Sequence, residues 1–74
     1  PQGVERWALL NNFADALVRA NRNSLDIERA KGLITEAIQV RPDIAPLYDT
    51  LAHVEVARSD CAAAIAAYRK AVQL

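Results

Sequence analysis

The second half of this chain, LYDTLAHVEVARSDCAAAIAAYRKAVQL, is the stretch that most restricts how the protein can fold. Its apolar residues recur at helical spacing on both sides of a break at Ser59 and Asp60. Small residues, Ala52 and Ala64 among them, stand where two packed helices would come closest. The stretch therefore predicts two helices folded back on each other as a hairpin.

The first half of the chain repeats this pattern. Residues 12–14 align with residues 50–52, which lie 38 positions later. Residues 27–38 align with residues 61–72, which lie 34 positions later. The two offsets differ by four residues, and we assign this difference to an elongated loop near residues 21–25, because a longer loop costs little entropy.

The sequence thus predicts an all-α fold of four helices, built from two similar hairpins over residues 4–42 and 43–74. The first helix is expected to run from about Val4 to Ala20. The second should end at Arg41, because the residue before a proline such as Pro42 avoids helical geometry. Gly32 falls inside the second helix, and we expect it on the solvent side.

Short polar residues mark the expected helix starts. Ser24 and Asp26 are both suitable caps for the second helix, and the sequence does not choose between them. Asp43 is the expected cap of the third helix, with Pro46 in its first turn, where a missing N–H is tolerated. Ser59 and Asp60 together are expected to stop the third helix and to cap the fourth.

Composition excludes several classes of protein. The 74 residues allow one small domain, and nine basic residues balance nine acidic ones, so no nucleic-acid or anionic-membrane partner is expected. No apolar run is long enough to span a bilayer, so no membrane insertion is expected. A single cysteine cannot form an internal disulfide. The chain starts at Pro1 without Met, which suggests a piece of a longer protein, and its compartment stays open between cytoplasm and periplasm.

The spacing of bulky and small residues in both units resembles the tetratricopeptide repeat, a helix–turn–helix unit of about 34 residues. In the second unit the positions that match are Tyr48, Leu51, Ala52, Ala64, Tyr68 and Ala71. In the first they are Leu10, Phe13, Ala14, Ala30, Ile34 and Ala37, followed by Pro42. Leu10 and Ile34 depart from the family's usual aromatics. The strings around residues 10–14 and 48–52 are similar to those of long bacterial proteins of this family.

The resemblance implies a function in protein–protein interaction, because the first helix of each unit in this family lines a concave surface that binds peptides. Carried over to this chain, the binding stripe is Asn11, Asn12, Asp15, Val18, Arg19, Asp49, Thr50, His53 and Val56. The alternative is that these are only solvated residues and that the chain is a structural homo-oligomerisation module. Ile65, Tyr68 and Val72 on the last helix would then form an exposed edge for self-association.

The charges of the stripe restrict the partner. Asp15 and Arg19 are spaced to form an ion pair along one helix. Arg19 is the only fixed positive charge of the stripe, which also carries Asp49. A clamp for a terminal carboxylate is therefore not expected, and the stripe suits a neutral or basic segment.

Three single residues are weighed as sites of chemistry. His53 is expected to donate a hydrogen bond to Asp49 and to have no catalytic or metal-binding role, because no converging ligands surround it. Cys61 is expected to fill the core. Trp7 is either a contact residue or a packing residue against an upstream repeat. No enzyme activity and no cofactor are therefore expected.

Overall fold

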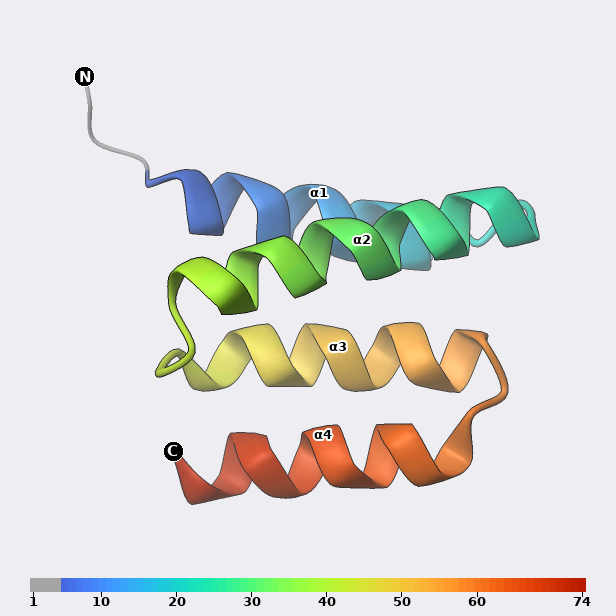
Figure 1. The fold of residues 1–74 in the computed structure, drawn as a ribbon. Helices are drawn as coiled ribbons and strands as arrows, with labels where there is room; N and C mark the ends of the chain where they lie inside the picture. Colours follow the sequence, from blue (N-terminus) through green and yellow to red (C-terminus); the bar gives the residue numbers. More distant parts are fainter. Residues whose placement is uncertain (1–4) are drawn as a thin grey trace.

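The computed structural model of the protein describes residues 5–74. Over this range the chain forms four helices and no strand: α1 (Arg6–Ala20), α2 (Ser24–Val40), α3 (Ala45–Ala57) and α4 (Cys61–Gln73). Helices α1 and α2 run antiparallel as one hairpin, α3 and α4 as a second, and α3 packs beside α2 (Figure 1). The predicted all-α fold of two hairpins is confirmed. Val4, the predicted start of the first helix, lies outside the described residues.

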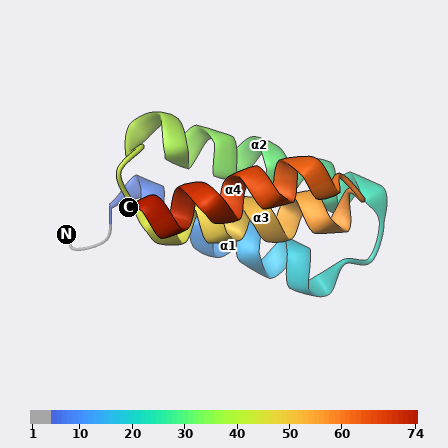
Figure 2. The same ribbon diagram turned by 90° about the horizontal axis from the view of Figure 1, so that it is seen from below.

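Helix α3 joins the two hairpins. It contacts α1 as well as α2, while its other side packs on α4. In the view from below, α4 and α3 lie across the space between α2 and α1 (Figure 2). One side of α3 therefore completes the core of the first hairpin.

The two turns within the hairpins have the same length, which corrects the prediction of an elongated loop. Residues 21–23 join α1 to α2, and residues 58–60 join α3 to α4. Ser24 and Leu25, which were assigned to the loop, lie in the first turn of α2. Three of the four extra residues therefore lengthen α2 at its N-terminus and the fourth lengthens α1 at its C-terminus. Residues added to a helix keep their backbone groups hydrogen-bonded.

Two of the helices, α2 and α3, do not have the caps that the sequence predicts. Asn23 caps α2, accepting a 2.8 Å hydrogen bond from the backbone N–H of Asp26, so neither Ser24 nor Asp26 is the cap. Helix α3 begins after Ile44 without a side-chain cap. The predicted cap, Asp43, instead accepts a 3.0 Å hydrogen bond from Arg41.

Of the two residues predicted to cap the fourth helix, Asp60 is confirmed as the cap. Asp60 accepts a 3.1 Å hydrogen bond from the backbone N–H of Ala63. Before it, Ser59 adopts a left-handed conformation with φ of 64°. The N–H groups of Ser59 and Asp60 bond to the carbonyls of Val56 and Glu55, both at 2.9 Å. This pair of bonds is the Schellman motif, which satisfies the last carbonyls of α3.

The main core lies within the first hairpin and against α3. Its buried members are Leu10, Ala14, Leu17, Ile27, Ala30, Ile34, Ala37, Leu47 and Val54. Leu47 and Val54 come from α3, so burying them depends on both hairpins. The second hairpin is held by small buried residues, Ala52, Ala64 and Ala67, which let α3 and α4 approach closely.

Phe13 and Cys61 are both exposed, although Cys61 was expected to fill the core. Phe13 retains 50% of its surface, because it lies on a side of α1 that no other described helix covers. Cys61 is also exposed, at the first position of α4. Gly32 is exposed as expected, and open space surrounds the position its Cβ would occupy.

Trp7 packs against this protein's own core, which neither sequence interpretation anticipated. It is half-buried, and the Arg41 guanidinium lies 5.9 Å from its ring centroid. A cation at this distance over an indole ring is attracted by the ring's negative face. The ring therefore joins the start of α1 to the end of α2.

A candidate peptide-binding groove between α1 and α3

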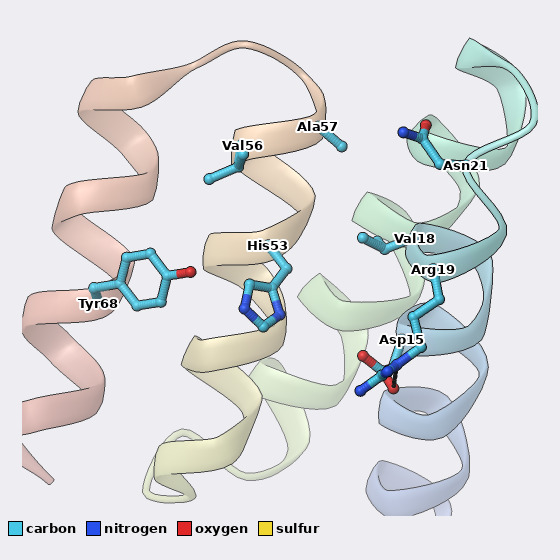
Figure 3. Close-up of a pocket in the computed structure, with 8 residues that line it drawn as sticks. All are labelled: Asp15, Val18, Arg19, Asn21, His53, Val56, Ala57 and Tyr68. Atoms are coloured by element: carbon cyan, nitrogen blue, oxygen red, sulfur yellow. Dashed lines mark hydrogen bonds and ion pairs between the residues drawn. The ribbon is translucent and has the colours of Figure 1, made fainter.

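An open groove of about 420 Å³ lies between α1 and α3, with one wall from α4 (Figure 3). Both long walls come from the first helix of a hairpin, and the two hairpins must therefore pack together for the groove to exist. The side chains that line it are Asp15, Val18, Arg19, Asn21, His53, Val56, Ala57 and Tyr68.

The α1 wall carries one charge of each sign, and the two charges are paired. Arg19 donates a 2.7 Å hydrogen bond to Asp15, which lies one turn earlier, as the spacing predicts. Both side chains reach solvent, so the pair contributes little stability. The pair matters more for ligand binding, because Arg19 is the only fixed cation among the lining residues and is already bound to a carboxylate.

The α3 wall presents an aromatic edge. The rings of His53 and Tyr68 are 6.0 Å apart and inclined at 75°, an edge-to-face arrangement. Val18 packs against the core at the base of the groove, while Val56 stays exposed on the rim. The groove thus alternates apolar surface with groups that can hydrogen-bond.

The expected hydrogen bond between Asp49 and His53 is not formed, although the structure describes both side chains. Asp49 instead lines a second, shallower depression with Pro46, Tyr68 and Val72, on the side of α3 toward α4. His53 turns toward the Tyr68 ring. A spacing of four residues allows a contact between Asp49 and His53 but does not require it. Here the His53 ring packs against Tyr68 of α4 instead.

Five of the nine predicted stripe residues line the groove: Asp15, Val18, Arg19, His53 and Val56. Thr50 does not, because it is buried with only 6% of its surface exposed and cannot reach a partner. Asn12 is exposed outside the groove, and Asn11 is half-buried with its Oδ1 enclosed and unpaired in the described part of the chain.

The sequence interpretation missed three lining residues: Asn21, Ala57 and Tyr68. Asn21 and Ala57 stand at helix ends, beyond the regular stripe. Tyr68 was placed on the exposed edge of the last helix, and its approach to His53 depends on how α4 crosses α3. No spacing rule within one helix carries that information.

Cys61, the only cysteine, is not among the lining residues. Within residues 5–74, no three His, Cys, Asp or Glu side chains are grouped to hold a metal ion. None of the four helices is long and apolar enough to cross a membrane.

Comparison of the chain with protein-family models, curated proteins and solved structures gave no match.

Proposed function

We propose that this protein is a non-enzymatic interaction scaffold of the tetratricopeptide type, which binds an extended segment of a partner protein in the groove between α1 and α3. The observation that carries the proposal is the convergence of five stripe residues from α1 and α3 on one groove. The small residues where α3 crosses α4 support the assignment to this type of repeat.

The lining favours a peptide with an apolar anchor. Val18, Val56 and Tyr68 offer apolar contact to such a side chain, while Asn21 and His53 offer donors and acceptors to the peptide backbone. The Asp15–Arg19 pair leaves no free cation among the lining residues to attract a carboxylate. The expected ligand is thus a neutral or basic segment rather than an acidic C-terminus.

A display screen of random linear peptides against the whole chain tests this proposal. Selected peptides should contain a large apolar residue, and Val56→Glu should weaken their binding at least tenfold, because a charge would be placed on the apolar rim. Leu25→Glu is the matched control, since Leu25 is at least as exposed as Val56 but lies outside the groove.

Two results would contradict the proposal. One is a selected set dominated by acidic C-terminal peptides. The other is equal binding by the Val56→Glu and Leu25→Glu chains, which would place the ligand elsewhere. Circular dichroism of both variants should show unchanged helicity, so that a loss of binding is not a loss of fold.

A second candidate function is homo-oligomerisation. The observation that favours it is the apolar face of α4, on which Ile65 and Val72 retain 51% and 87% of their surface. Large exposed apolar groups in one row are typical of association surfaces. Binding in the groove and association through α4 are compatible with each other.

A further inference from the structure

Two apolar surfaces are exposed, one on the first helix, α1, and one on the last helix, α4. We define the α4 surface as the exposed residues Cys61, Ile65, Tyr68 and Val72, and the α1 surface as the exposed residues Leu9, Phe13 and Ala16. We propose that copies of this chain stack head to tail, with the α4 surface of one copy covering the α1 surface of the next. The proposal deepens the second candidate function, and it does not depend on groove binding.

The interface between α2 and α3 within the chain is the template for this contact. Lys31 and Arg58 reach across it to Glu55 and Glu28, respectively. These two contacts fix an antiparallel register for α2 and α3.

Continuing this register along the helices brings Ile34 to within one residue of the level of Leu51, and Ile38 to within one residue of the level of Leu47. All four residues belong to the core cluster or pack against it. The α2–α3 interface is thus a charged end joined to an apolar stretch.

Because of the internal repeat, the α2 side of this interface corresponds to a face of α4, and the α3 side corresponds to a face of α1. Adding 34 to the α2 positions Ile27, Lys31, Ile34 and Ile38 gives the α4 surface. Subtracting 38 from the α3 positions Leu47, Leu51 and Val54 gives the α1 surface. Apart from Lys31, these α2 and α3 residues belong to the core cluster or pack against it, whereas all of their counterparts are exposed. In the same register, Tyr68 of one copy would face Phe13 of the next, and Val72 would face Leu9.

The charged residues of the α2–α3 interface have apolar counterparts on both α4 and α1. The counterparts of Lys31 and Glu55 are Ile65 and Leu17, and those of Glu28 and Arg58 are Ala62 and Ala20. The positions of both ion pairs are thus apolar on α4 and on α1; of the two α1 counterparts, Ala20 is exposed and Leu17 lies in the core of the first hairpin. A partner that kept the carboxylates of the template would bury a charge against Ile65 without a counter-charge, which is unfavourable. A second copy of this chain has no such mismatch, and this is why we choose it as the occupant.

The proposed contact joins two different surfaces, so it leaves one of each kind free after two copies have met. Such heterologous contacts extend into chains or close into rings, unlike a two-fold dimer. The test is sedimentation velocity of the whole chain up to millimolar concentration, with reductant present because Cys61 is exposed. The average mass should rise beyond that of two chains. A protein that stays monomeric throughout overturns the proposal.

Two variants and their mixture test the head-to-tail arrangement. Phe13→Glu blocks only the α1 surface, and Ile65→Glu blocks only the α4 surface. Each variant alone should be monomeric, because every contact needs both surfaces. An equimolar mixture should form a complex of one chain of each, joined through the single pair of intact surfaces. Dimers of Phe13→Glu alone would show that α4 surfaces pair with each other, and would overturn the proposal.

Control variants keep the result interpretable. Leu25→Glu lies on α2 outside both surfaces, and Val56→Glu lies in the groove, so both should assemble like the wild-type protein. The Val56→Glu result also separates this proposal from groove binding. If either blocking variant lost helicity, Leu9→Glu and Val72→Glu would repeat the experiment at more exposed positions of the same two surfaces.

Discussion

Lys31 of α2 donates a hydrogen bond to the carboxylate of Glu55 on α3, and this contact joins the two hairpins. The Glu55 side chain is only 4% exposed. Its other oxygen accepts a 2.8 Å hydrogen bond from Arg58, which also bonds to Glu28. A buried carboxylate is tolerated here because both of its oxygens have charged donors.

The first prediction concerns Glu55→Gln, which keeps the shape of the side chain and removes its charge. We expect the free energy of unfolding at neutral pH to fall by about 2 kcal/mol, because buried hydrogen bonds to charged groups are lost. Urea denaturation followed by circular dichroism measures this. The matched control is Glu28→Gln, which removes an exposed partner of Arg58 and should cost no more than about 0.5 kcal/mol. Equal effects of both substitutions would contradict the argument.

The same carboxylate predicts a dependence on pH. Burial alone would raise the pKa of Glu55, but hydrogen bonds from Lys31 and Arg58 outweigh it and lower the folded-state pKa below its ordinary value of 4.5. The unfolded state therefore binds this proton first, so the contribution of Glu55 is complete well above pH 4.5 and is lost as the pH falls through the folded-state pKa. The stability difference between wild type and Glu55→Gln should shrink on acidification.

Comparing the two chains at each pH is necessary, because Arg41 also lowers the pKa of Asp43 through a side-chain hydrogen bond. Asp43 is present in both chains, so its titration cancels in the difference. A difference that stayed constant from neutral pH to well below 4.5 would show that the charge of Glu55 does not stabilise the fold.

The second prediction concerns Gly32, in the interior of α2. Nothing lies within 4 Å of the position that a Cβ would take there. Gly32→Ala should therefore stabilise the protein by about 1 kcal/mol, since alanine loses less backbone entropy in a helix. In a domain of this size, that corresponds to a rise in the midpoint of thermal unfolding of roughly 4–8 °C. An unchanged or lower midpoint would mean that the surface of α2 is covered in solution.

The third prediction concerns Ser59, whose φ of 64° is costly for a residue with a Cβ. Ser59→Gly should stabilise the protein by about 1 kcal/mol, because the Schellman motif keeps its hydrogen bonds and loses the strain. The control is Asn21→Gly at the end of α1, also left-handed with φ of 42°. Its gain should be smaller, because asparagine tolerates this conformation. Thermal unfolding of the two variants gives the comparison.

The helices could be predicted from the sequence because apolar spacing and alanine content both favour them, as in α4. Their boundaries could not be predicted as well. The offset between the two units shows that residues were added, but it does not show whether they lengthen a loop or a helix. Likewise Asn23, Ser24 and Asp26 are all suitable caps, and only the path of the backbone selects Asn23.

Part of the candidate site could likewise be predicted from the sequence, and part could not. Asp15, Val18 and Arg19 could be grouped from their spacing on one helix, and the structure brings them together. Thr50 follows Asp49 by one residue, so it points in another direction and is buried. Tyr68 was missed as a groove residue because its position depends on contacts between helices far apart in the sequence.

The last prediction concerns Tyr68, which belongs to both the groove and the α4 surface. If groove binding and head-to-tail stacking both operate, Tyr68→Ala should weaken both, each by about tenfold, since truncating an interface aromatic typically has an effect of this order. Val56→Glu should impair only peptide binding, and Ile65→Glu only assembly. Titration of a selected peptide and sedimentation of the same samples measure the two effects. A Tyr68→Ala chain that lost only one of them would show that the two surfaces act separately at this ring.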